Sequence, residues 1–200
     1  MMPLLALAAA YFLGGIPFGY YLVRFATGRD VRTLGSGNIG ATNVLRTTGR
    51  AAGVVTLLLD IAKGFAAVWL GAWLTHGAVL WTSLAALAVM AGHAYPLLLH
   101  FRGGKAVASF LGAFLYLAPL PVLATLILFV AVVAYSRYIS LVSIIAAGSF
   151  PFAVWLILHP PVELTAAAAV AGAFIIYRHK SNIARLRAGT ENVLHLGGKR

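Results

Sequence analysis

The sequence has no cysteine and only four acidic residues among its 200 positions. Without a thiol, the chain has neither a disulfide framework nor a cysteine nucleophile. The few carboxylates leave little material for a metal site, and the six histidines lack the spacing of metal ligands. We therefore expect no metal and no cofactor.

Charge of either sign is also scarce. Only 10% of the residues are charged and 62% are hydrophobic, whereas a soluble domain has about 25% charged and about 45–50% apolar residues. This composition predicts an all-α, polytopic integral membrane protein that forms a single domain over residues 1–200.

The apolar runs indicate how often the chain crosses the membrane. A transmembrane helix needs about 20 apolar residues. Five runs are close to that length, and a longer one is interrupted by Pro119 and Pro121, which end one helix and start another. The first run lacks the positive leading region of a signal peptide, so we expect it to remain uncleaved. The sequence thus predicts seven transmembrane helices, the fourth and fifth being short, at residues 2–24, 51–74, 79–100, 106–118, 121–135, 139–158 and 162–177.

The basic residues fall in alternate loops. The net charge of +11 would suggest nucleic acid in a soluble protein, but here the charges sit in short loops between apolar runs, so we expect no nucleic-acid partner. The loops THGA, LAPLP and HPPVE contain no Lys or Arg. By the positive-inside rule, the N-terminus is predicted to lie outside and the C-terminus in the cytoplasm.

Residues 34–49, LGSGNIGATNVLRTTG, form a polar loop between two spans. The loop matches G-x-G-x-x-G, but a transmembrane helix precedes it in place of a strand, which excludes a Rossmann fold. Glycine amides and a helix N-terminus can instead bind an anion, and an arginine one turn later can bind phosphate through two hydrogen bonds. The alternative is a flexible loop whose arginines only set the topology. The candidate binding residues are Gly35, Ser36, Gly37, Asn38, Gly40, Thr42, Asn43 and Arg46.

Residues 92–109, GHAYPLLLHFRGGKAVAS, form a second glycine-containing loop. It is not a Walker A loop, because Leu99 and Ala106 stand where Gly and Ser or Thr belong. A Gly-Gly-Lys sequence before a helix can still bind phosphate, whereas the histidine could serve the site or be structural. The candidates are His93, Gly103, Gly104 and Lys105.

The tail, residues 177–198, reads YRHKSNIARLRAGTENVLHLGG. A basic segment next to a membrane can simply hold lipid headgroups. Its other polar residues are not those of a polybasic anchor, so we predict a more specific role for His179, Asn182, Arg185, Gly189 and Glu191.

Asp60 and Lys63 lie three residues apart inside the second span and can share one helix face. Ionisable residues in a span are costly and usually face a polar interior. The pair is either functional or a structural ion pair. If Lys63 faces the site, it adds positive potential there.

Three segments carry a family resemblance: SGNIGATN with Arg46, then GHAYPLLLHFRGGKAVAS, then HKSNIARLRAGTE. In this order they resemble the cytoplasmic motifs of the bacterial PlsY family, the acyl-phosphate:glycerol-3-phosphate acyltransferases, and DIAKG at residues 60–64 matches as well. Ala106 stands where the family usually has Gly, and Ser109 where it has Thr. Lys180 replaces the usual Arg and loses its two-pronged geometry.

The resemblance implies a seven-helix enzyme in the bacterial cytoplasmic membrane, with its active site on the cytoplasmic side. It implies transfer of a fatty acyl group from acyl phosphate to the 1-hydroxyl of glycerol 3-phosphate. The products are lysophosphatidic acid and phosphate, in the first step of phospholipid biosynthesis. We expect the chain to act among membrane lipids as a monomer.

The residues fit this chemistry. Acyl phosphate already carries a good leaving group, so the protein must mainly hold two phosphates, align the hydroxyl and stabilise charge on the acyl oxygen. The sequence has neither an H-x-x-x-x-D element nor a G-x-S-x-G elbow, so we expect direct transfer without an acyl-enzyme. Either a substrate phosphate oxygen or His179 accepts the proton. The predicted catalytic residues are Ser36, Arg46, Lys105, His179 and Asn182.

A transporter or channel for an anionic metabolite is the main alternative, with the glycine loops as its selectivity element. A transport site is expected near the midplane and often between inverted repeats. This sequence shows no such repeat, and its motifs are predicted on one face, which favours the enzyme.

Overall fold

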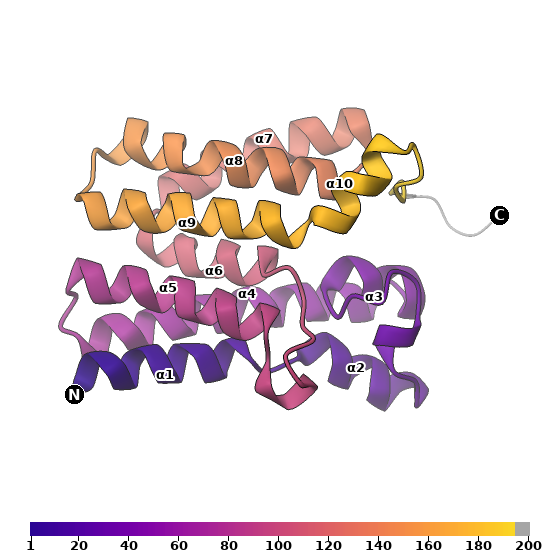
Figure 1. Ribbon diagram of the computed structural model, residues 1–200, viewed down its shortest axis with the longest axis horizontal. Helices are drawn as coiled ribbons and strands as arrows, with labels where there is room; N and C mark the ends of the chain where they lie inside the picture. Colours follow the sequence, from indigo (N-terminus) through magenta and orange to yellow (C-terminus); the bar gives the residue numbers. More distant parts are fainter. Residues whose placement is uncertain (195–200) are drawn as a thin grey trace. The chain divides into compact units, whose positions relative to one another are not determined.

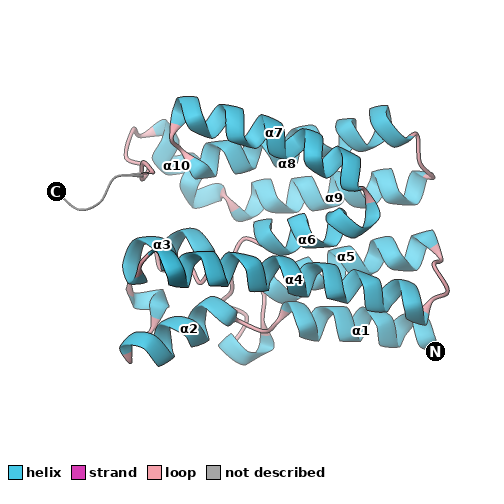
Figure 2. Cartoon of the chain, turned by 180° about the vertical axis from the view of Figure 1, so that it is seen from behind, coloured by secondary structure: helices cyan, strands magenta, loops and turns pink. Residues whose placement is uncertain are grey.

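The computed structural model describes residues 1–194. Within these residues every regular element is a helix (Figures 1 and 2), which confirms the predicted all-α class. The chain divides into two compact units, Met1–Leu117 and Ala118–Arg200, and the single domain over residues 1–200 stays a prediction. The boundary falls where Pro119 begins a new helix, because proline cannot continue the preceding one.

The first unit is built around a central helix, α4. Helix α4 packs against α1, α5 and α6, and α1 also packs against α5. Small residues permit these contacts, since a Cβ atom at Gly14 or Gly92 would overlap the backbone between α1 and α5, and one at Gly64 or Gly112 the backbone between α4 and α6. The elements are α1 (Met2–Gly14), α2 (Phe18–Thr27), η1 (Val31–Thr33), α3 (Ala41–Thr48), α4 (Arg50–Leu74), α5 (Val79–Ala94), η2 (Leu97–Leu99) and α6 (Val107–Leu117).

The first predicted span, residues 2–24, is not one continuous helix. Helix α1 ends at Gly14 and α2 begins at Phe18. Pro17 lies in the break, where its missing N–H and its ring prevent a regular helix from continuing. The hydropathy of the run gave no sign of this break, because the residues on both sides of it are apolar.

The second unit contains α7 (Pro119–Ser136), α8 (Ile139–Leu158), α9 (Val162–Arg178) and α10 (Lys180–Arg187). Helix α8 packs against α7 and α9, and α10 contacts both α8 and α9. The predicted split at the prolines is confirmed, because α6 ends at Leu117 and α7 starts at Pro119. Helix α7 is longer than the predicted 121–135, since Pro119 occupies its first turn, where proline is tolerated.

Five segments of residues 1–194 are long and apolar enough to cross a membrane: Met2–Thr27, Arg50–Leu74, Val79–Leu99, Pro119–Ser136 and Ile139–Leu158. Helix α7 therefore reaches spanning length, contrary to its prediction as a short helix. Helix α6, with 11 residues, and α9, with 17, are shorter. The total of seven spans and the orientation of the termini stay predictions.

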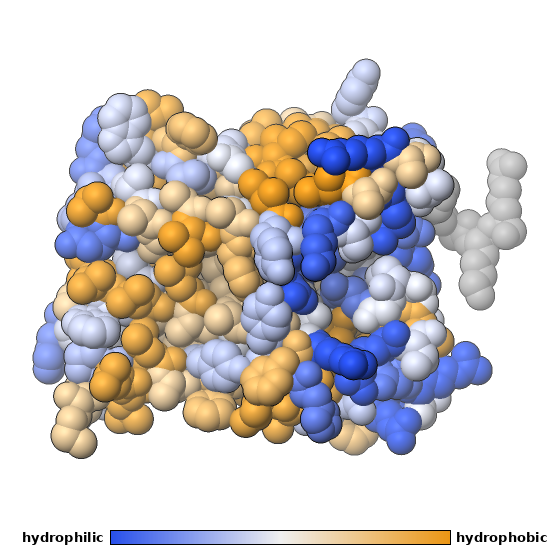
Figure 3. All heavy atoms as spheres, in the orientation of Figure 1, coloured by the Kyte–Doolittle hydropathy of each residue, from blue (hydrophilic) through white to orange (hydrophobic). Residues whose placement is uncertain are grey.

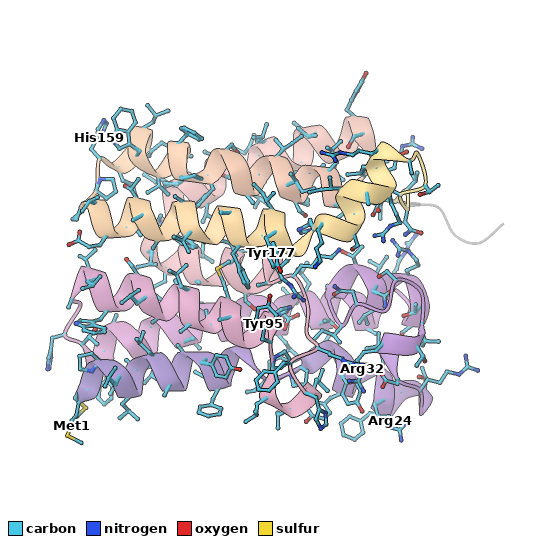
Figure 4. The ribbon with its side chains drawn as sticks, viewed as in Figure 1. Met1, Arg24, Arg32, Tyr95, His159 and Tyr177 are labelled. Carbon is cyan, nitrogen blue, oxygen red and sulfur yellow. The ribbon has the colours of Figure 1, made fainter. Side chains whose placement is uncertain are left out.

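The polar side chains of the first unit gather at one end. Figure 3 shows hydrophilic residues over the α2 end of this unit. Figure 4 places Arg24 and Arg32 there, far from Met1 at the other end of α1. Helices α4 and α5 are joined by a short turn, so the start of α4 and the end of α5 also lie at this polar end.

Candidate active site

The first glycine loop is organised around the buried side chain of Asn43, which is 2% exposed. Its Oδ1 accepts a hydrogen bond from the Ser36 amide at 2.9 Å. Its Nδ2 donates to three backbone carbonyls, those of Val31, Leu34 and Asn38, at 3.4, 3.0 and 2.8 Å. All polar atoms of this side chain are thus used inside the loop. Asn43 therefore fixes the shape of the loop, and its part in substrate binding stays a prediction.

The glycines of this loop serve its conformation. Gly35 and Gly37 have φ of 55° and 71°, a region that favours glycine. The Gly37 amide donates to the Leu34 carbonyl at 2.9 Å, and the Gly40 amide donates to Asn38 Oδ1 at 2.8 Å. We predicted that glycine amides bind the anion, but the amides of Gly37 and Gly40 have partners within the loop. These two amides hold a turn, and the binding of the anion by the glycines of this loop stays a prediction.

Other groups that can bind an anion lie on α3 and beside its start. Gly40 is the N-cap of this helix, and no side chain makes a capping hydrogen bond there. The positive end of the helix dipole is therefore available to an anion. Ser36 and Arg46 are exposed and Thr42 is half-buried. Thr42 and Arg46 are four residues apart on α3 and so share a helix face.

The sequence did not reveal how the loop joins α2. Arg32 donates to Asp30 through two nitrogens, Nε at 3.0 Å and Nη2 at 2.7 Å, and its guanidinium lies 5.2 Å from the centre of the Tyr20 ring. This hydrogen-bonded ion pair lowers the pKa of the Asp30 carboxyl and raises the pKa of Arg32. The only signal was an acid two residues before a base. The pair fixes the entrance to the first loop.

Apolar packing brings the first two motifs together. A buried cluster joins α2, the first loop and the second loop. Leu99 of the second loop is its only member from outside residues 23–44, and it packs with Val23, Val31, Ile39 and Val44. The two loops thus pack together within the first unit, and their position on the cytoplasmic face stays a prediction. The third motif belongs to the second unit and is described separately below.

The second loop is held to the end of α5 by its own glycines. The Gly103 amide donates to the Ala94 carbonyl at 3.2 Å, and the Gly104 amide donates to the His93 carbonyl at 3.1 Å. A Cβ atom at Gly104 would overlap the His93 imidazole. These amides, predicted to bind phosphate, thus fasten the loop. Lys105, half-buried beside them, is the group of this segment that can bind phosphate.

A buried polar network lies beneath this loop. Lys63 Nζ lies 2.8 Å from Asp60 Oδ1, which confirms that the two residues share a helix face. Lys63 also donates to the Ile16 carbonyl at 2.8 Å, in the break between α1 and α2. His93 Nδ1 lies 3.7 Å from Asp60 Oδ1 and 3.0 Å from Ser109 Oγ. Lys63 and His93, predicted to bind substrate, are thus at most 5% exposed and contact other protein groups.

The third motif, in the second unit, is organised by Glu191. Its carboxylate accepts hydrogen bonds from Asn182 Nδ2 at 2.8 Å, Arg185 Nε at 2.7 Å and Ser140 Oγ at 3.1 Å. Burial alone would raise the pKa of Glu191, but these three donors outweigh it and the pKa is lowered. The carboxylate thus ties the segment after α10 to both α10 and α8. Sequence reasoning missed Ser140, because it lies 51 residues away from Glu191 and belongs to no motif.

His179 joins α9 to α10 and is 2% exposed. Its Nδ1 lies 2.8 Å from the Ile175 carbonyl oxygen, which can only accept, so Nδ1 carries the proton. In a neutral imidazole, Nε2 then carries the lone pair. Gly189, with φ of 68°, lets the chain turn after α10, and the Thr190 amide donates to the Arg185 carbonyl at 2.9 Å. This tautomer suits a general base.

Within residues 1–194 no group of three or more His, Cys, Asp or Glu side chains could hold a metal ion.

Residues 1–194 are all-helical and include five apolar segments of spanning length, and the chain shares its fold with a solved integral membrane protein. It is therefore an integral membrane protein of the polytopic class. That solved protein is PlsY (YgiH), an integral membrane glycerol 3-phosphate acyltransferase, in its glycerol 3-phosphate form. It is 36% identical to this chain, with a TM-score of 0.92 over 98% of this chain and 96% of that one. The lysophosphatidic acid form gives a TM-score of 0.87 at 35% identity.

Comparisons of sequence point to the same family as the solved structures. A family model described as glycerol-3-phosphate acyltransferase matches residues 4–199. The glycerol-3-phosphate acyltransferase of Geobacter sulfurreducens is 48% identical over 94% of this chain and 96% of its own length. That of Geotalea daltonii is 47% identical over 92% and 93%. This chain belongs to the glycerol-3-phosphate acyltransferase family, the PlsY family, and is an acyltransferase. The transporter alternative finds no support here.

Proposed function

We propose that this chain transfers a fatty acyl group from acyl phosphate to the 1-hydroxyl of glycerol 3-phosphate. Lysophosphatidic acid and phosphate are released on the cytoplasmic side of the bacterial inner membrane. The observation that supports the proposal is the hydrogen-bonded first loop, in which Ser36 and Arg46 are exposed and the start of α3 has no side-chain cap. These groups suit an anionic substrate in a chain otherwise poor in charge.

We assign phosphate binding to both loops of the first unit. Ser36, Thr42 and Arg46 with the α3 N-terminus bind one phosphate through hydroxyl, guanidinium and amide donors. Lys105 binds the other as a compact positive charge. Asn182 and His179 orient glycerol 3-phosphate, and Glu191 holds the Asn182 carboxamide in place.

The reaction needs no covalent enzyme intermediate. The glycerol hydroxyl oxygen attacks the acyl carbonyl carbon, the C–O bond to phosphate breaks, and phosphate leaves with the electron pair. The positive groups stabilise the charge that develops on the acyl oxygen and on the leaving phosphate. The hydroxyl proton passes to a phosphate oxygen of the substrate, or to His179 as the alternative base. The acyl chain stays among the membrane lipids that surround the enzyme. We also propose that the enzyme acts as a monomer.

The test incubates the detergent-purified protein with acyl phosphate and glycerol 3-phosphate and detects lysophosphatidic acid by mass spectrometry. We expect product only when both substrates and the protein are present. In parallel, proteoliposomes report uptake of labelled glycerol 3-phosphate without acyl phosphate. Uptake without product formation would contradict the proposal and support the transporter.

A further inference from the structure

The loop that carries Lys105 is strained. His100, Phe101 and Ala106 have φ of 52°, 61° and 62°, a left-handed region that residues other than glycine rarely adopt. Ala106 is fully buried in this conformation. Strained residues persist only where the surrounding structure fixes them, and they concentrate at functional sites. Some part of the first unit must therefore hold this loop.

Backbone hydrogen bonds hold the first part of the loop. The Phe101 amide donates to the Pro96 carbonyl at 2.9 Å, and the Gly103 amide donates to the Ala94 carbonyl at 3.2 Å. The Gly104 amide donates to the His93 carbonyl at 3.1 Å. At the far end of the loop, where α6 begins, the Phe110 amide donates to the Ala106 carbonyl at 2.7 Å, and a further contact ties this end back to α5.

That contact is a hydrogen bond between side chains. His93 Nδ1, in the last turn of α5, lies 3.0 Å from Ser109 Oγ, in the first turn of α6. The bond thus joins the two ends of the loop, with residues 94–108 between them. His93 is 3% exposed and Ser109 is 0% exposed, so water does not compete for the bond. We call this pair the His93–Ser109 clasp.

A third helix anchors the clasp. Asp60 Oδ1 of α4 lies 3.7 Å from the same His93 nitrogen. Asp60 is in turn held by Lys63, whose Nζ lies 2.8 Å away and also donates to the Ile16 carbonyl. Burying such an ion pair costs desolvation free energy, so its presence is not explained by stability alone. It fixes the imidazole relative to α4 and to the break between α1 and α2.

We propose that the His93–Ser109 clasp, anchored by Asp60, positions Lys105 for the reaction. His93 and Ser109 are then positioning residues, which act through Lys105 without touching substrate. The clasp supplies the constraint that keeps Ala106 and its neighbours in their strained conformation. This inference rests on the proposed function. It gives His93 a positioning role in place of the substrate-binding role predicted from the sequence.

The experiment compares Ser109→Ala, which removes the hydroxyl, with Ser109→Thr, which keeps it. Because the chain has no natural cysteine, Phe101→Cys can carry a single spin label in the loop. Arg29→Cys, in an exposed stretch away from the clasp, carries the control label. Electron paramagnetic resonance, the unfolding temperature, kcat and KM for glycerol 3-phosphate are measured for each variant.

We expect Ser109→Ala to lower kcat/KM roughly 10-fold or more, because a buried partner is lost. The label at 101 should gain a mobile component while the label at 29 stays unchanged. Ser109→Thr should restore both the activity and the spectrum. The proposal is overturned if Ser109→Ala keeps wild-type activity and spectrum, or if both variants lose activity with no change at 101.

Should Ser109→Ala fail to fold, His93→Gln is measured in the same way, and an unchanged spectrum and activity in that variant would equally overturn the proposal. A wild-type protein that makes no lysophosphatidic acid would contradict the proposed function, whereas the spectra test the clasp independently of that outcome.

Discussion

Asn43 Oδ1 accepts the Ser36 amide at 2.9 Å, while Nδ2 of the same side chain donates to carbonyls across the loop. One carboxamide thus connects the start of α3 to the segment that presents Ser36. Because Asn43 is buried, removing it leaves several backbone groups without partners.

We expect Asn43→Ala to destabilise the protein by about 2 kcal/mol and to lower activity, because buried backbone groups lose their hydrogen bonds. Asn43→Asp keeps the acceptor for the Ser36 amide but places a carboxylate oxygen against three carbonyls. Its stability and activity should therefore be no higher than those of Asn43→Ala. Thermal unfolding and kcat/KM check this. A fully active Asn43→Asp would contradict the role of the carboxamide donors.

Arg46→Ala and Lys105→Ala should each reduce turnover about 100-fold or more, since each removes a phosphate-binding charge. Membrane insertion and unfolding temperature should stay close to those of the wild type. Arg29→Ala is the matched control, because Arg29 is an exposed arginine just before the same loop, and it should keep most activity. Retention of most activity in Arg46→Ala and Lys105→Ala would refute the assignment.

Glu191 predicts a dependence of stability on pH. The pKa of its carboxyl is lowered in the folded protein. Its stabilisation is therefore present above the unfolded pKa and is lost as the pH falls through the folded pKa. We expect the unfolding temperature to decrease when the pH is lowered below about 4. Glu191→Gln should lower it at pH 7 and flatten this dependence, whereas Glu163→Gln, which removes none of these contacts, should not.

His179→Gln distinguishes the two candidate bases. If a substrate phosphate oxygen takes the proton, the loss in kcat at neutral pH should be less than about tenfold, because His179 then only orients the substrate. A loss of about 10³-fold or more would assign the proton transfer to His179. The pH profile of kcat gives the same answer independently.

Gly104→Ala should be destabilising by about 2 kcal/mol and should impair activity, because the added Cβ would overlap the His93 imidazole. Gly148→Ala is the matched control, since its Cβ would meet only Ile176 Cδ1 at an ordinary 3.7 Å. Equal stability and activity of both variants would show that the loop does not pack on His93 as described.

Local features could be predicted from the sequence. The helical class follows from long apolar runs, and the helix boundary at Pro119 follows from the chemistry of proline. The Asp60–Lys63 pair follows from helical spacing. The break at Pro17 was missed, because one proline in an apolar run does not reveal whether the helix bends or ends.

The hydrogen-bond partners of the loop amides and of the polar side chains could not be predicted from the sequence. The amides of Gly37 and Gly104 point to partners that depend on how the whole loop turns. Ser140 donates a hydrogen bond to Glu191, which lies 51 residues away in the sequence. No sequence periodicity predicts a contact at that separation. Motif composition therefore predicted which residues form the site, and the fold shows which of them make hydrogen bonds that hold the loops; the substrate contacts stay predictions.

The most direct test of the account is a quantitative balance of products from acyl phosphate. Purified protein is incubated with acyl phosphate and glycerol 3-phosphate, and lysophosphatidic acid and inorganic phosphate are measured together, with acyl-CoA as the alternative donor. We predict equal amounts of lysophosphatidic acid and phosphate, formed only when glycerol 3-phosphate is present. Phosphate released without lysophosphatidic acid, or product formed from acyl-CoA but not from acyl phosphate, would contradict it.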